Sequence, residues 1–250
     1  MAADQDRTDA FRGARFTRSD LGGAAFRDSD LRGVRISGCW VDGLSVSGVY
    51  GRLLVDDVDV TAFVTAELDR RHPERVRVRE VRTVEEHRAA WDELTGLWAG
   101  TVARARRLDE AARHERVDDE WSVTETLRHL VFATDCWAGR MVLERPEPYH
   151  PLGLPPTDFE LADAATAGLD PAARPSFEEV LAVRAGRTAL VTDLLDRLTD
   201  AGLDRVCEGS PWPGDPDHPR PVRECLRVIL NEECEHRRFA ERDLAALEAR

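Results

Sequence analysis

The segment Asn231–Leu244, NEECEHRRFAERDL, places polar side chains on the apolar face of a predicted helix. At about 100° per residue, the helix predicted over 221–247 has one continuous apolar face. That face consists of Val222, Cys225, Leu226, Ile229, Ala240, Leu244 and Leu247. Glu232, Glu233 and His236 fall on the same face in mid-helix. An unpaired carboxylate in a helical core is costly, and a bound cation would compensate, so the segment predicts a metal site.

A further histidine lies on the helix predicted over residues 122–144, which begins within the stretch Glu120–Leu130, EWSVTETLRHL. His129 lies on the flank of the apolar stripe of this helix, beside Thr126 and Ala133. Because these neighbours are small, the imidazole has room to reach a facing helix. Carboxylates and histidines that project inward from facing helices are a common way to build a metal site in a bundle.

We therefore expect His129, Glu232 and His236 to be the metal ligands. Glu232 and His236 are four residues apart, so their side chains can converge on one point. Glu233 is an alternative to Glu232, because it also faces the stripe, three residues from His236. Each residue also has a plain structural interpretation, as a hydrogen-bonded core histidine or as a simple ion pair within one helix. A His₂Glu set with an open position is typical of catalytic zinc sites.

Four long helices are predicted in the C-terminal two-thirds of the chain, over residues 84–107, 122–144, 177–199 and 221–247. Three begin with the S/T-x-x-E capping box, at Thr83–Glu86, Ser122–Glu125 and Ser176–Glu179. The fourth begins near Pro221, which suits the first turn of a helix. A long linker rich in proline and glycine separates the second helix from the third. A linker of that length can cross the bundle, so the second and third helices are expected to run parallel.

The N-terminal segment has a period of five residues, which fits neither a helix nor a strand. The recurring large side chains are Phe11, Phe16, Leu21, Phe26, Leu31, Ile36, Val41 and Val46. A fixed short period indicates a stacked solenoid, and so short a stack buries little core by itself. Residues 9–55 resemble the pentapeptide-repeat family, which implies a right-handed quadrilateral β-helix with the central Phe or Leu pointing inward.

The predicted fold class is therefore α+β by segment, with a short β-helix followed by an all-α four-helix bundle that has a long crossover between its second and third helices. The predicted segments are a pentapeptide-repeat segment (1–58), a connecting helix and linker (59–78), and a metal-binding bundle (79–250). Within the linker, Asp59 is expected to cap a short helix over residues 60–70.

The composition excludes several classes of protein. The chain has 250 residues and a formal net charge of −13, which argues against non-specific binding to nucleic acid or to anionic membranes. It has no apolar run long enough to span a membrane, and its N-terminus lacks an apolar signal core. Five scattered cysteines without a CxxC pair are typical of reduced thiols. We expect a cytoplasmic protein, and a homodimer is compatible with the sequence.

The stretches EWSVTETLRHL and NEECEHRRFAERDL together resemble the DinB superfamily, over roughly residues 80–247. The resemblance implies a four-helix bundle with the long crossover. Members often carry one histidine in the second helix and an H-x-x-x-H pair in the fourth, and Glu232 stands where the first histidine of that pair is usual. The resulting set of His129, Glu232 and His236 is similar to that of mycothiol-dependent maleylpyruvate isomerase, an enzyme of this superfamily.

This resemblance implies a metal-dependent transferase or isomerase that activates a low-molecular-weight thiol, such as mycothiol, for attack on a small electrophile. The implied cofactor is one divalent metal ion, with zinc first and nickel or iron as alternatives. Its partners would be the thiol and the electrophile. The sequence assigns no catalytic or cofactor-binding residue beyond the metal ligands. The alternative function is a non-catalytic metal-binding bundle with the pentapeptide solenoid as a protein-interaction module.

Overall fold

A computed structural model describes residues 8–48, 51–157 and 159–250 of the chain. It divides into two compact units, residues 1–44 and 45–250, and each is described by itself. The segment boundaries predicted from the sequence, at 58 and 78, remain predictions. Within the described ranges the chain is mostly helical with a few two-residue strands, and none of its helices has both the length and the apolar character of a membrane span.

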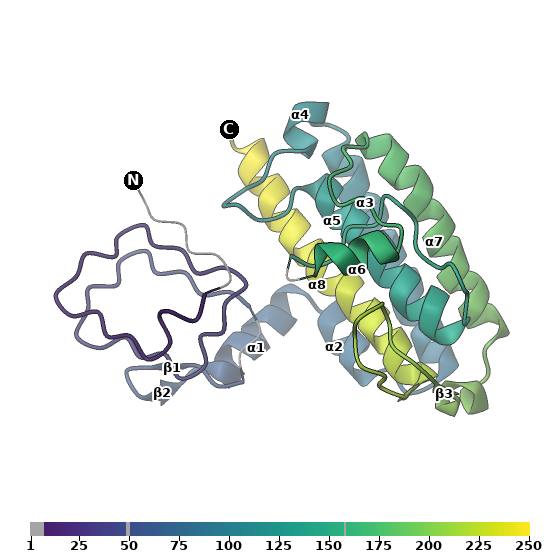
Figure 1. The fold of residues 1–250 in the computed structure, drawn as a ribbon, viewed down its shortest axis with the longest axis horizontal. Helices are drawn as coiled ribbons and strands as arrows, with labels where there is room; N and C mark the ends of the chain where they lie inside the picture. Colours follow the sequence, from purple (N-terminus) through teal and green to yellow (C-terminus); the bar gives the residue numbers. More distant parts are fainter. Residues whose placement is uncertain (1–7, 49–50, 158) are drawn as a thin grey trace. The chain divides into compact units, whose positions relative to one another are not determined.

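The regular elements all lie in the second unit (Figure 1). The helices are α1 (Thr61–Arg71), α2 (Glu74–Glu80), α3 (Val84–Ala105), α4 (Glu110–Arg113), α5 (Val123–Thr134), the π-helix η1 (Asp135–Val142), α6 (Leu161–Thr166), α7 (Phe177–Arg197), the 3₁₀ helix η2 (Asp200–Asp204) and α8 (Val222–Glu248). The strands form two antiparallel hairpins, β1 (Leu54–Val55) with β2 (Val58–Asp59) and β3 (Val206–Cys207) with β4 (Arg220–Pro221).

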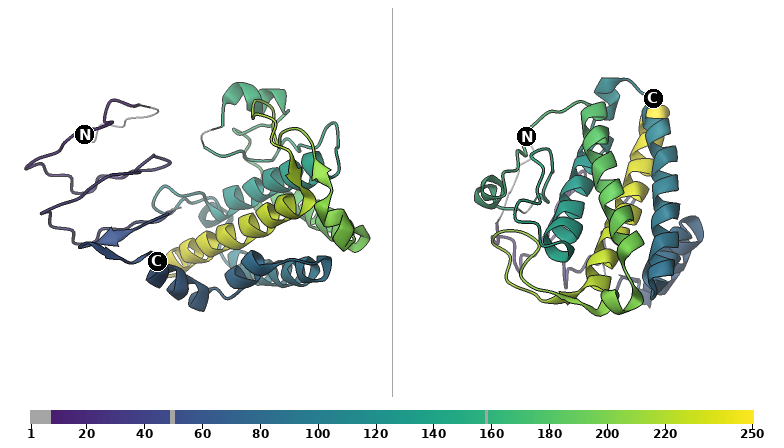
Figure 2. Two further views of the ribbon diagram at one scale, coloured as in Figure 1. Left: turned by 90° about the horizontal axis from the view of Figure 1, so that it is seen from below. Right: turned by 90° about the vertical axis from the view of Figure 1, so that its right-hand side faces the viewer.

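The four long helices α3, α5, α7 and α8 pack side by side as a bundle, as the right-hand view in Figure 2 shows. All three predicted capping boxes are present, so α3, α5 and α7 begin where the sequence predicted. In α5, for example, Ser122 accepts a hydrogen bond from the Glu125 amide, and the Glu125 carboxylate accepts one from the Ser122 amide. These reciprocal bonds satisfy amides that the first helical turn leaves unpaired.

The chain direction in the bundle follows from the hydrogen bonds between its helices. Trp98 donates to the backbone oxygen of Glu233, and Arg104 pairs with Glu248, so α3 and α8 run in the same direction. Trp91 donates to Thr192 and Arg88 donates to the backbone oxygen of Leu195, so α7 runs opposite to α3. The segment from Leu143 to Ser176, which contains α6, carries the chain back so that α7 runs parallel to α5. The crossover predicted from the linker length is confirmed.

The second bundle helix departs from the prediction of a single α-helix over residues 122–144. It changes at Asp135 into the π-helix η1, which ends at Val142. Asp135 is buried, and its carboxylate pairs with Arg187 of α7 and accepts a hydrogen bond from the His150 amide. The wider turn of the π-helix thus coincides with a buried ion pair. The local sequence pattern does not reveal this pair, because Arg187 lies on another helix.

The short helices before the bundle match the sequence in part. The predicted helix over residues 60–70 is α1, shifted by one residue. Its N-cap residue is Val60 and not the expected Asp59, although the Asp59 carboxylate accepts a hydrogen bond from the Thr61 amide. The prediction missed α2, which packs against α3 and α8. A β-hairpin with Asp56 and Asp57 both at positive φ precedes α1, as a two-residue type I′ turn requires.

The first unit turns once every five residues and, over residues 8–48, contains neither helix nor strand. The oxygens of Phe11, Leu21 and Leu31 accept hydrogen bonds from the amides of Ala14, Ala24 and Val34. Gly13, Gly23 and Gly33 have φ of 74°, 75° and 79°, as the third residue of a type II turn requires. The central side chains, expected to point inward, are exposed; that of Phe26 is 67% exposed. The unit as described therefore has no buried core.

Candidate metal centre

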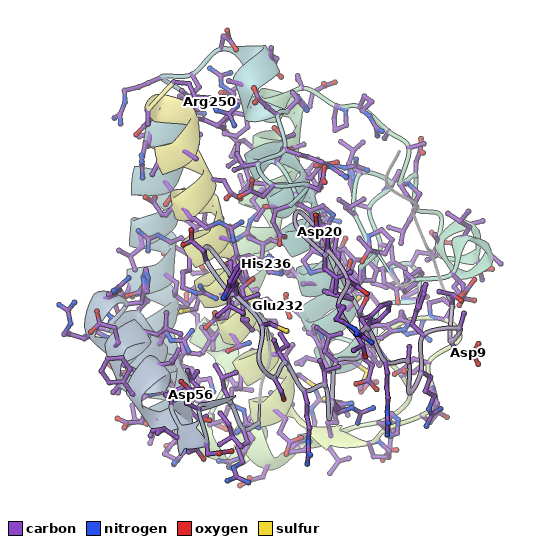
Figure 3. All side chains as sticks on the ribbon, turned by 90° about the vertical axis from the view of Figure 1, so that its left-hand side faces the viewer. Asp9, Asp20, Asp56, Glu232, His236 and Arg250 are labelled. Atoms are coloured by element: carbon purple, nitrogen blue, oxygen red, sulfur yellow. The ribbon has the colours of Figure 1, made fainter. Side chains whose placement is uncertain are left out.

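Three side chains from two facing helices converge in the bundle. His129 lies on α5, while Glu232 and His236 lie one turn apart on α8, where Figure 3 labels them. The Glu232 Oε2 atom is 3.3 Å from Nε2 of His129 and 3.0 Å from Nε2 of His236. One potential ligand atom from each residue lies within 4.8 Å of the other two. These are the three side chains that the sequence predicted to meet, and among the described residues no other group of this kind forms.

A backbone oxygen of the crossover fixes the orientation of the His129 ring. Its Nδ1 atom is 2.9 Å from the backbone oxygen of Leu154 in the crossover. Because a carbonyl oxygen can only accept, Nδ1 carries the proton, and in the neutral ring Nε2 presents a lone pair toward Glu232. Two acceptors 3.3 Å apart repel each other unless a proton or a cation lies between them. A neutral histidine and a carboxylate in this arrangement therefore fit a divalent cation.

Burial and hydrogen bonding act in opposite directions on the Glu232 carboxyl. Burial raises its pKa, but the imidazoles of His129 and His236 beside it outweigh that effect and hold the pKa well below its usual range. Burial lowers the pKa of His236 and so favours the neutral imidazole, which is the form that binds metals. Glu232 is therefore ionised and His236 is biased toward the protonation state that a metal site needs.

The alternative ligand Glu233 points elsewhere. The residue is 1% exposed, and both of its carboxylate oxygens pair with Arg184 on α7. Burial raises the pKa of Glu233, and the Arg184 guanidinium opposes that shift. The two adjacent carboxylates thus face different neighbours, with Glu232 beside the histidines and Glu233 in a buried ion pair.

An aromatic side chain covers the two histidines. The ring centroid of Trp121 lies 4.7 Å from that of His129 and 5.8 Å from that of His236, nearly parallel to the latter. Trp121 directly precedes Ser122, which caps α5, so the capping box fixes the start of the helix next to this indole. Trp121 therefore forms part of the wall of the site.

Two family profiles match the chain. The profile of the DinB superfamily matches residues 93–240, more than half of the chain, and this range holds all three converging side chains. The chain belongs to the DinB superfamily. The profile of the pentapeptide repeats matches eight copies within residues 11–43, so both resemblances found in the sequence are confirmed. No curated protein and no solved structure matches this DinB protein.

His150, His218 and Cys234 lie outside the converging group. His150 accepts a hydrogen bond from the Leu152 amide and helps to order the crossover, while His218 is exposed in the loop before β4. Cys234, next to Glu233 on α8, is buried in the hydrophobic core. Neither the hydrogen bond to the Leu154 carbonyl nor the ion pair with Arg184 could be inferred from the sequence, because both depend on how distant segments pack.

Proposed function

We propose that this DinB protein is a metal-dependent transferase or isomerase that activates a low-molecular-weight thiol, such as mycothiol, for attack on a small electrophile. Its superfamily includes metal-dependent enzymes. The observation that supports the proposal most directly is the convergence of His129, Glu232 and His236 within 4.8 Å. Zinc is the first candidate for the ion, because two histidines and one carboxylate with a further open position are typical of catalytic zinc.

A divalent cation held by these ligands would lower the pKa of a coordinated thiol and thereby supply a thiolate at neutral pH. The residues themselves have separate tasks. Glu232 contributes a negative charge and stays ionised, so it acts as a ligand and not as a general base. His129 presents Nε2, since its Nδ1 proton is donated to Leu154. Trp121 packs against both imidazoles.

The first experiment is elemental analysis of gently purified protein, together with a matched pair of variants. We expect about one zinc ion per chain in the wild type. His236→Ala should lower zinc affinity by more than the roughly 10–100-fold that follows loss of an outer hydrogen-bonding partner, because a ligand itself is removed. His218→Ala, at an exposed histidine, should bind zinc as the wild type does. Wild-type protein that holds no stoichiometric metal and cannot be reconstituted would refute the metal site.

The second experiment separates catalysis from simple metal binding. Zinc-loaded protein is mixed with a set of small electrophiles, with and without a low-molecular-weight thiol, and the loss of each electrophile is followed. Thiol-dependent turnover that His236→Ala abolishes is the expected result. A fully loaded protein that consumes neither thiol nor electrophile would favour the alternative function, a non-catalytic bundle with the pentapeptide unit as an interaction module.

For the pentapeptide unit we propose a right-handed quadrilateral β-helix. A corner at every fifth residue supports this proposal, because type II turns at Gly13, Gly23 and Gly33 alternate with positive-φ bends at Arg18, Asp28 and Gly38. Circular dichroism of the isolated repeat segment, joined to further identical repeats so that it forms enough coils to fold, would test it. A spectrum without β-structure would contradict the proposal.

A further inference from the structure

Arg128, the neighbour of His129 on α5, is almost completely buried and lies against the crossover. The residue is only 2% exposed. Its guanidinium donates three hydrogen bonds to backbone oxygens: Nε to Leu152 at 2.9 Å, Nη1 to Ala173 at 2.8 Å and Nη2 to Asp170 at 2.8 Å. One side chain therefore holds both the beginning and the end of the crossover segment from residue 152 to 173.

The backbone of Arg128 completes the connection. Its carbonyl oxygen accepts a hydrogen bond from the Leu154 amide at 3.1 Å. The Leu154 carbonyl in turn accepts the Nδ1 proton of His129 at 2.9 Å. Residues 152 and 154 are thus fixed to α5 by Arg128, and the carbonyl that orients His129 lies in that same short stretch.

We propose that Arg128 is a positioning residue: by holding the crossover against α5, it keeps the Leu154 carbonyl in place and thereby fixes His129 with Nδ1 protonated and Nε2 facing Glu232. This inference rests on the proposed function, because it concerns how one of the three ligands is prepared. If the crossover moved away, a neutral His129 could carry its proton on Nε2 instead. That tautomer has no lone pair on the atom that faces Glu232 and His236, so the ligand would be lost.

A purely structural role for Arg128 makes a different prediction, and Arg88 provides the matched control. Arg88 on α3 also donates to backbone oxygens, with Nε and Nη2 at 3.0 Å and 2.7 Å from the oxygen of Leu195 near the end of α7. It holds a chain segment in the same way but has no hydrogen bond to a residue of the metal centre among the described contacts. Loss of Arg88 should therefore affect stability without affecting His129.

The test compares full-length wild type, Arg128→Met, Arg128→Lys and Arg88→Met. The tautomer of His129 is read in the metal-free proteins at pH 8 from the ¹⁵N shifts of the imidazole, assigned with His129→Gln. Zinc affinity is measured by competition with a chelator. In wild type and in Arg88→Met we expect the Nδ1–H tautomer and equal zinc affinity. In Arg128→Met we expect a mixture of tautomers and a loss of roughly 10–100-fold in zinc affinity.

Arg128→Lys keeps a buried cation that can donate hydrogen bonds, so its tautomer ratio and zinc affinity should lie between those of wild type and Arg128→Met. If Arg128→Met does not fold, Arg128→Lys alone tests whether Arg128 positions His129. An unchanged tautomer and unchanged affinity in a folded Arg128 variant would overturn the inference. Equal losses in Arg128→Met and Arg88→Met would also overturn it, because they would reduce the effect to general stability. If wild type binds no zinc, the proposed function fails, while the tautomer in the metal-free proteins still decides the role of Arg128.

Discussion

Glu232 and Glu233 are adjacent on α8 but have different surroundings and therefore different roles. Glu232 faces the imidazoles of His129 and His236, whereas Glu233 points to Arg184 and is fully enclosed. A carboxylate beside two histidines can exchange its partners for a metal ion. A carboxylate in a buried ion pair cannot leave that pair without stranding the opposite charge.

Substituting the two glutamates separately should therefore give opposite results. Glu232→Gln should lose most of its zinc with little loss of stability, because the side chain is half-buried and its volume is retained. Glu233→Gln should keep its zinc but lose about 3–5 kcal/mol in the free energy of unfolding, because Arg184 is left buried without a counter-charge. Zinc content and urea denaturation measure the two effects. Zinc lost from Glu233→Gln but retained by Glu232→Gln would transfer the ligand role to Glu233.

His87 on α3 predicts an acid sensitivity that has no connection with the metal centre. It is 1% exposed; its Nδ1 lies 2.7 Å from the oxygen of Thr83, and Nε2 has no partner in the described residues. Burial lowers its pKa below the 6.5 of a free histidine. His87 therefore takes up a proton less readily in the folded protein than in the unfolded chain. The contribution of neutral His87 to stability is complete above pH 6.5 and is lost as the pH falls through the folded-state pKa.

Replacing His87 by Leu should reduce this pH dependence. We expect the free energy of unfolding of wild type to fall between pH 7.5 and pH 5.5, and to fall less in His87→Leu, because the buried leucine takes up no proton on unfolding. His218→Leu, at an exposed histidine, serves as the control and should behave as the wild type does. Urea denaturation of each protein at pH 7.5 and at pH 5.5 measures this difference. An equal loss of unfolding free energy in wild type and in His87→Leu would exclude His87 as the source of the acid sensitivity.

The sequence could predict which side chains converge because most of that signal is local. Glu232 and His236 are one turn apart, and a polar pair on an apolar stripe is visible without any tertiary structure. The sequence favoured Glu232 but left Glu233 open as an alternative, because both lie on the broad inner face and only the position of Arg184 on another helix separates them. The hydrogen bond from His129 to Leu154 was equally hidden, since it spans 25 residues and ends on a backbone atom.

At the scale of elements, helix starts were predicted better than helix interiors. A capping box is a four-residue signal, and Thr83, Ser122 and Ser176 all make the expected bonds. The π-helix η1 has no such signal, because it accompanies a buried pair between Asp135 and Arg187, which lie 52 residues apart. The five-residue period likewise gave the spacing of the turns correctly but did not by itself produce a buried core.

The capping boxes predict a measurable contribution to stability. Ser122→Ala removes the side-chain acceptor of the Glu125 amide at the start of α5 and should lower the free energy of unfolding by about 1 kcal/mol. Ser176→Ala should cost a similar amount, because it removes the same contact at the start of α7. Ser45→Ala, an exposed position outside any helix, should cost much less. Urea denaturation at one pH measures all three, and equal stability of the Ser122 and Ser45 variants would contradict the prediction.

At the scale of the whole molecule, the chain joins two units that differ in how they are built. The bundle unit, residues 45–250, contains both buried hydrophobic clusters, and its helices carry the site on their inner faces. The repeat unit, residues 1–44, repeats a local turn, and its described side chains are all exposed. His129, Glu232 and His236 all belong to the bundle unit, and so do Arg128, Leu154 and Trp121, which orient or cover them.

Removing the repeat unit should therefore leave the metal centre intact. A chain that begins at Ser45 keeps every proposed ligand and every hydrogen bond that positions His129. We expect it to bind about one zinc ion with the affinity of the full-length protein, and His236→Ala in the shortened chain should lose that ion just as it does in full length. Zinc titration and thermal unfolding of the four proteins measure this. A shortened chain that is folded by circular dichroism but has lost zinc affinity would show that the repeat unit shapes the site, because every ligand would still be present.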